Sequence, residues 1–182
     1  ATFTAFLVVP KLVQFYEKRT ILLTAIALAA LIPPIPILLF VNGYLPAIGT
    51  WDLFFATIPF LYIANSSLSA SSIIRESMLG DISDEVELET HLGQQGLMYA
   101  SSSLIGKLNT GLGILMAGLA LEFIGFPQGS QITPSADHIF NLAMVQGPLV
   151  ALLMIIPFAI FSMYKIDRFK HQEIIAELEN RS

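Results

Sequence analysis

Four long apolar stretches, separated by short polar segments, dominate the pattern of hydrophobic and polar positions along this chain. They cover about 20–45, 51–74, 97–126 and 139–164, and each is long enough for a helix to cross a bilayer at about 1.5 Å of rise per residue. A shorter apolar stretch, about 1–10, predicts the end of a further helix whose beginning lies outside this chain. The pattern therefore predicts an all-α membrane protein with about four full transmembrane helices plus one partial.

The spans divide the chain into one transmembrane bundle, 1–164, and a short tail, 165–182, in which charged and aliphatic residues alternate. The acidic segment 75–96 separates the second and third spans and is expected to be a loop. Three prolines interrupt the first span, and proline removes a backbone donor and kinks a helix. We therefore expect this span to be broken or bent after Leu31. The prolines are Pro33, Pro34 and Pro36.

Composition supports the membrane assignment. Hydrophobic residues make up 54% and charged residues 13% of the chain, whereas soluble domains carry about 25% charged residues. The chain has no cysteine, which excludes disulfides and thiolate metal sites. The net charge is −5, and no cluster of Lys and Arg favours nucleic acid. No zinc-protease pair, phosphate-binding glycine loop or Ser/His/Asp arrangement is found, so an enzyme is not expected.

The distribution of cationic residues predicts the orientation in the membrane. The two loops 40–50 and 126–138 contain no Lys or Arg, whereas eight cationic residues fall on the opposite side if the four spans alternate. Cytoplasmic segments carry this excess. The sequence thus predicts a multi-pass protein of the cell (inner) membrane with a cytoplasmic C-terminus and a cytoplasmic acidic segment. The eight residues are Lys11, Lys18, Arg19, Arg75, Lys165, Arg168, Lys170 and Arg181.

The ninth cation, Lys107, lies near the middle of the third span. A charge at this depth is costly and is rarely kept without a use. Tyr99, Ser103 and Thr110 share its helical face, and Asn109 lies beside it. We interpret these five residues as a substrate-binding face lining a polar cavity. The alternative is that Lys107 extends its ammonium to the membrane interface, although about ten residues, roughly 15 Å, separate it from that end of the helix.

The acidic segment is the second candidate site. Asp81, Asp84 and Glu87 recur every three residues, a spacing that places them on one helical face. With Arg75, they are interpreted as a cytoplasmic gate whose carboxylates pair with cationic groups of another domain in one conformation. A solvated connection between helices is the alternative. Carboxylates alone are weak support for a divalent metal site, so none is expected.

The stretch from Met78 to Phe126 resembles the glycoside–pentoside–hexuronide:cation symporters, the melibiose-carrier branch of the major facilitator superfamily. The resemblance covers the acidic motif, the internal lysine, the spacing of the glycines and the ending LEFIGF. It differs at His91–Gly93, at Gln95 and at Ser72, where melibiose carriers have a tryptophan. The residues that match are Asp81, Asp84, Glu87, Thr90, Gly96, Lys107, Gly111 and Gly113.

The resemblance implies a fold, a function and partners. The chain would be the C-terminal part of a facilitator-type transporter that acts by alternating access around a midplane site. It would carry out cation-coupled symport of a sugar or a related small polar solute, with Lys107 in the cavity. Its partners would be the lipid bilayer, a small-molecule substrate and the N-terminal half of the same protein. No cofactor is implied; the coupling cation, Na⁺ or H⁺, would bind in that other half.

Two other functions remain open from the sequence. Ser72 provides no aromatic platform for a sugar ring, which favours a transporter of lipid-like amphipathic substrates. A non-transporting membrane scaffold protein would use the polar stripe on the third span only to pack helices. The scaffold hypothesis predicts that Lys107→Met is harmless, whereas both transporter hypotheses predict lost transport with normal insertion.

Overall fold

The computed structural model describes residues 1–126, 135–164 and 168–179. In this part of the chain all regular structure is helical, and four helical stretches are long and apolar enough to cross a membrane. The all-α membrane fold predicted from the pattern is therefore confirmed. The stretches are Lys18–Val41, Trp51–Thr90, Gln95–Phe123 and Asp137–Ser162.

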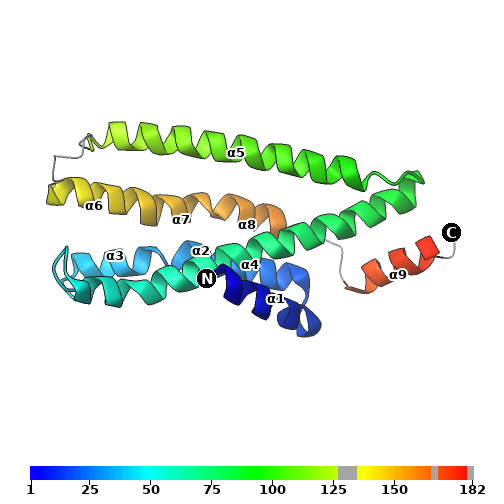
Figure 1. Cartoon of the computed structure of the whole chain (residues 1–182), viewed down its shortest axis with the longest axis horizontal. Helices are drawn as coiled ribbons and strands as arrows, with labels where there is room; N and C mark the ends of the chain where they lie inside the picture. Colours follow the sequence, from blue (N-terminus) through cyan, green and yellow to red (C-terminus); the bar gives the residue numbers. More distant parts are fainter. Residues whose placement is uncertain (127–134, 165–167, 180–182) are drawn as a thin grey trace.

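The N-terminal helix and the first span are joined by a short connection, and both pack mainly on the long helix α4 (Figure 1). Helix α1 runs Thr2–Phe15 and extends past the predicted end near residue 10, because Pro10 is accommodated inside it. Only Tyr16 and Glu17 separate it from α2, Lys18–Leu31. The expected break then follows: α3, Pro34–Val41, begins after a two-residue turn at the prolines. This prediction is confirmed.

Helix α4, Trp51–Thr90, is the long diagonal element of Figure 1. It includes most of the segment predicted as a loop, so the prediction of a loop over 75–96 is wrong as far as Thr90. The physical reason is composition: residues 75–90 contain no proline, a single glycine, Gly80, and many good helix formers such as Glu, Leu and Met. The helix ends at His91, whose φ of 59° is left-handed.

Helix α5, Gln95–Phe123, returns antiparallel to α4, and the fourth span follows in pieces. That span consists of α6, Ala136–Met144, a π-helical turn η1, Val145–Leu149, then α7, Val150–Leu153, and α8, Ile155–Ser162. Pro148 lies in the π-turn, where its missing N–H is tolerated. The turn packs on the break of the first span, where a Cβ added to Gly147 would lie 2.4 Å from Ile37 Cδ1.

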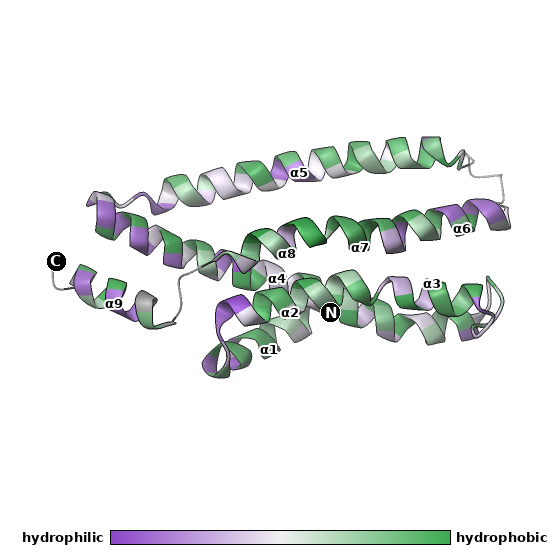
Figure 2. Cartoon of the chain, turned by 180° about the vertical axis from the view of Figure 1, so that it is seen from behind, coloured by the Kyte–Doolittle hydropathy of each residue, from purple (hydrophilic) through white to green (hydrophobic). Residues whose placement is uncertain are grey.

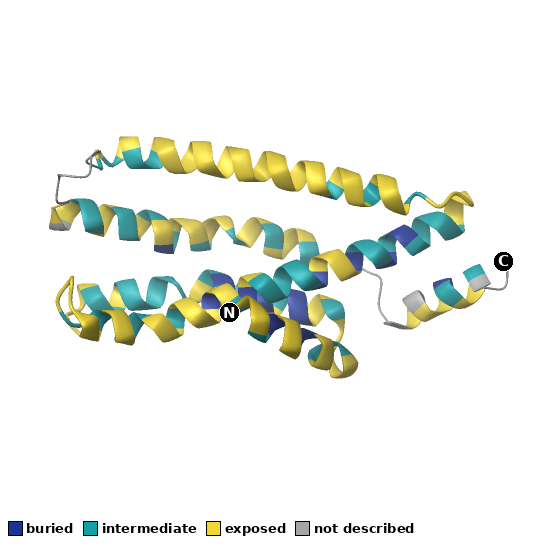
Figure 3. Cartoon of the chain, viewed as in Figure 1, coloured by how far each residue is buried: buried dark blue, intermediate teal, exposed yellow. Residues whose placement is uncertain are grey.

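The hydrophobic core lies among α1, α2 and α4, with the end of the fourth span packed against it. Leu22 and Ile74 are the largest apolar side chains that are completely buried there. Helix α5 contributes no buried residue, and Figure 3 shows it exposed along its length. The described helices are thus one packed bundle plus one helix, α5, that contacts α4 but buries none of its own residues. The core is formed by Val9, Ile21, Leu22, Ile26, Ile74 and Met78.

The tail forms a helix, α9, Arg168–Glu179, that contacts α4. Ile174 is buried in this contact, whereas Phe169 is exposed. The rest of the predicted tail, residues 165–167 and 180–182, lies outside the described residues, as do two of the predicted orientation cations, Lys165 and Arg181. Figure 2 shows that the acidic end of α4 is the most hydrophilic part of the long helices.

Candidate functional site

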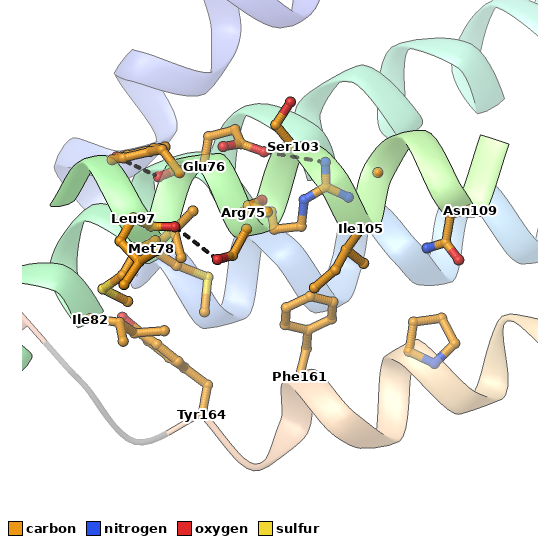
Figure 4. Close-up of a pocket in the computed structure, with 17 residues that line it drawn as sticks. Arg75, Glu76, Met78, Ile82, Leu97, Ser103, Ile105, Asn109, Phe161 and Tyr164 are labelled. Carbon is orange, nitrogen blue, oxygen red and sulfur yellow. Dashed lines mark hydrogen bonds and ion pairs between the residues drawn. The ribbon is translucent and has the colours of Figure 1, made fainter. Parts of the chain in front are cut away.

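A cavity of about 1100 Å³ opens between α4, α5 and the end of the fourth span (Figure 4). Helix α4 supplies one wall through a face that includes Arg75, Glu76 and Met78. The N-terminal half of α5 supplies the opposite wall, and Pro157, Phe161 and Tyr164 close the third side. The volume is above the usual range of about 300–1,000 Å³ for small-molecule sites. A ligand of that size therefore fits between these elements.

The lining combines polar and apolar groups. Helix α5 presents three consecutive serines, Ser101–Ser103, and Asn109. The facing surfaces are largely apolar, and a π-system is available at Phe161. A site of this composition can hold the apolar body of a ligand while hydroxyl and amide groups orient its polar end. The apolar lining residues on α4 and the fourth span are Met78, Leu79, Ile82, Pro157 and Phe161.

Only some of the predicted substrate-binding residues line this cavity. Tyr99, Ser103 and Asn109 line the cavity, whereas Lys107 and Thr110 do not. Successive helical residues are rotated by about 100°, so Lys107 lies about 140° around α5 from the lining residue Ser102 but only about 40° from Ser103, at the edge of the lining face. No ion pair of Lys107 occurs among the described residues. The Lys107 side chain is exposed, and Thr110 donates a hydrogen bond to the Gly106 carbonyl at 3.0 Å.

Tyr99 connects the two walls. Its hydroxyl donates to the Glu76 carbonyl oxygen at 3.5 Å, across the start of the cavity. The approach is close because Gly80 has no side chain there: a Cβ at this position would lie 3.3 Å from the Tyr99 hydroxyl. The tyrosine therefore fixes how near the first turns of α5 come to α4.

A buried ion pair lies behind the cavity and joins three elements. Lys18, the first residue of α2, donates to both carboxylate oxygens of Asp81 on α4, at 2.7 and 2.8 Å. The Tyr164 hydroxyl donates to Asp81 Oδ2 at 3.2 Å. The Asp81 side chain is only 7% exposed. One carboxylate thus links the ends of the first, second and fourth spans.

The environment of this carboxylate perturbs the tyrosine. Burial, and then the negative charge of Asp81, raise the pKa of the Tyr164 hydroxyl well above its ordinary value of 10.0. Its hydrogen bond to Asp81 and the charge of Glu85 act in the same direction. Tyr164 is therefore a neutral hydrogen-bond donor at every physiological pH.

The four predicted gate residues do not form one cluster. Asp81 is committed to Lys18 and Tyr164, as above, whereas Asp84 accepts from Gln95 Nε2 at 3.3 Å across the α4–α5 turn. The Glu87 carboxylate approaches Gly93 in the same turn. Arg75 is on the cavity side of α4 and contacts Glu76 at 3.4 Å. Asp84 and Glu87 thus occupy the tip of the long hairpin, about one turn or more beyond Asp81.

Sequence reasoning missed the roles of Lys18 and Tyr164 beside Asp81. Lys18 counted only as an orientation cation, and Tyr164 only as the last residue of a span. The available signal was weak: both residues end apolar stretches on the side of the bundle where Asp81 also lies. Pairing across 63 and 83 positions depends on tertiary packing.

Comparison with known proteins gives two kinds of match. A sequence profile of the family described as MFS/sugar transport protein matches residues 1–168. An uncharacterized symporter of Synechocystis sp. is 28% identical over 73% of this chain, and one of Bacillus subtilis is 26% identical over 95%. The chain spans only 26% and 35% of the length of these two relatives. No solved structure matches it significantly.

Proposed function

Because the chain belongs to the MFS/sugar transport family, and is thus part of a multi-pass membrane transporter, we propose that it is the C-terminal part of a secondary active transporter. The whole protein moves a sugar or a related small polar solute together with Na⁺ or H⁺. The mechanism is alternating access, in which two helical bundles rock around a site near the middle of the membrane. The N-terminal half of the same protein is the second bundle, and it carries the cation site.

The observation that carries this proposal is the exposure of α5, which buries none of its residues in the described structure. An apolar helix that presents Lys107 and several other polar side chains without burying any of its residues needs a neighbour that is neither lipid nor the described bundle. A second bundle facing α5 encloses the lysine in a polar cavity between the two halves. In that arrangement Lys107, Ser103, Asn109, Thr110 and Tyr99 contact or orient the substrate.

The proposed gate is at the end of α4. We place this end in the cytoplasm of the cell (inner) membrane, because the described cations outside the spans gather there. Asp84 and Glu87 lie at the tip of the α4–α5 hairpin, where they can pair with cationic groups of the other half when the cytoplasmic side is closed. Asp81 and Arg75 act from within this half, Asp81 by fixing α4 to α2.

The proposal is tested by uptake into proteoliposomes that contain the full-length protein. A Na⁺ or H⁺ gradient is imposed, and accumulation of radiolabelled sugars is measured for the wild type and Lys107→Met. We expect the variant to insert normally but to lose at least about 90% of gradient-driven uptake, because a charged contact contributes roughly 1.5–3 kcal/mol. Leu108→Met is the matched control. Full uptake by Lys107→Met would favour a scaffold role for the stripe.

One observation favours a second candidate, a transporter of lipid-like amphipathic substrates. Most of the cavity lining on α4 and the fourth span is apolar, including Met78, Ile82 and Phe161. The same proteoliposome assay with lysolipids in place of sugars separates the candidates. Accumulation of lysolipids without sugars would select the second.

A further inference from the structure

The cavity contains one cation among its described lining residues, Arg75. Arg75 lies on the wall formed by α4, across from the serines of α5, as Figure 4 shows. Its side chain is 54% exposed, so it is not part of the packed core. The guanidinium therefore faces the space that a substrate would fill.

Two neighbours orient this guanidinium through one nitrogen. Nη2 of Arg75 donates to Ser72 Oγ at 3.3 Å and to Glu76 Oε1 at 3.4 Å, both long contacts. Ser72 is one turn earlier on the same helix, and Glu76 is the next residue. The donors on Nε and Nη1 have no partner among the described residues. A planar guanidinium with free donors matches the two oxygens of a carboxylate or a phosphate.

The surrounding walls suit the rest of such a ligand. Ser103 and Asn109 of α5 supply hydroxyl and amide groups on the side facing Arg75. Ile105, Pro157 and Phe161 supply an apolar surface next to them. The Glu76 carboxylate is 47% exposed; it balances the charge of Arg75 when the cavity holds no anion, and its long contact is readily exchanged.

We propose that this cavity recognises a small organic anion, with a carboxylate or phosphate headgroup on Arg75 and an apolar ring or chain against Phe161 and Ile105. The inference rests on the proposed transport function and specifies its substrate class: an anionic solute is selected over its neutral counterpart. Arg75 then decides specificity. Ser72 and Glu76 are positioning residues that hold Nη2 and leave the other donors for the ligand.

The test compares matched probes that differ in charge. The full-length protein is placed in lipid nanodiscs, and binding is measured as thermal stabilisation over a range of probe concentrations. One pair is 4-nitrophenyl glucuronide and 4-nitrophenyl glucoside. The other pair is octyl phosphate and octyl glucoside. The first pair represents a sugar acid and the second a lipid-like anion, so the pair that responds identifies the source of the anion.

We expect the anion of at least one pair to bind roughly tenfold or more tightly than its neutral partner, as charge-assisted contacts predict. Arg75→Gln should abolish this preference without weakening the neutral probe, whereas Arg75→Lys should retain part of it. Lys11→Gln removes an exposed positive charge outside the cavity and should change nothing.

Three results would overturn the inference: equal binding of anion and neutral partner in both pairs, an anion preference that survives Arg75→Gln, or no binding of any probe. None of them touches the transport proposal, which is decided separately by gradient-driven uptake and by Lys107→Met. Conversely, a transporter that fails all uptake assays but shows the Arg75-dependent preference would retain the site and lose the transport function.

Discussion

The Lys18–Asp81 pair is the residue-scale feature on which the bundle depends most. Removing one member of a buried pair leaves an uncompensated charge, at a cost of about 3–5 kcal/mol. Asp81 is nearly buried but Lys18 is 25% exposed, so we expect Lys18→Met to lower the free energy of unfolding by roughly 3 kcal/mol, the low end of that range. Equilibrium unfolding of the full-length protein in mixed detergent micelles measures this.

The double variant Lys18→Met with Asp81→Asn distinguishes a pair from two separate effects. Contacting residues are not additive, so the double variant should be destabilised by less than the sum of the single variants. The exposed Arg75–Glu76 pair is the matched control, and Glu76→Gln should change the free energy of unfolding by at most about 1 kcal/mol. Strict additivity at Lys18 and Asp81 would contradict the structure.

At the scale of elements, most of the architecture follows from local chemistry in the sequence. Hydrophobic length predicted the four spans, and Pro33 with Pro34 predicted the break of the first one. The error at 75–96 arose because acidic residues were equated with a loop, although helix propensity without proline favours continuation of α4. The π-turn of the fourth span was not predicted, since it depends on packing against a second helix as well as on Pro148.

The contact between that turn and the first span gives a sharp test. Gly147 is buried, and in Gly147→Ala the new methyl would lie 2.4 Å from Ile37 Cδ1 but an ordinary 3.5 Å from Pro34 Cα. We expect this substitution to lower the free energy of unfolding by about 1–3 kcal/mol, as overpacking does. The midpoint of unfolding of the full-length protein reports the change.

Ile37→Val supplies the control, because it removes Cδ1 and leaves Cγ1 at 3.8 Å from the added methyl. In the Ile37→Val background, Gly147→Ala should be neutral or slightly stabilising, since alanine is favoured over glycine in a helix by about 1 kcal/mol. The same loss in both backgrounds would show that the backbone at Gly147, and not the contact with Ile37, sets the cost.

For the whole molecule, the informative fact is that one helix has no buried residue while the rest packs around a core. The sequence located the polar residues of this helix, but it could not tell which of them line the cavity. That distinction requires the position of α4 and the fourth span, which place Ser103 and Asn109, but not Lys107, in the lining. The chain covers about a third or less of the length of its two relatives.

Cysteine labelling of the full-length protein tests the surroundings of Lys107 directly, because the present chain has no cysteine of its own. Lys107→Cys should react with a charged, membrane-impermeant thiol reagent, since the cavity between two bundles is aqueous, and a bound substrate should protect it. The control is Leu112→Cys. Leu112 is five positions after Lys107, about 140° around the helix, and the residue is 58% exposed in this chain. It should face lipid or protein and react at least about tenfold more slowly. Equal labelling at both positions would mean that α5 has no distinct aqueous side, and the lysine would then serve helix packing rather than transport.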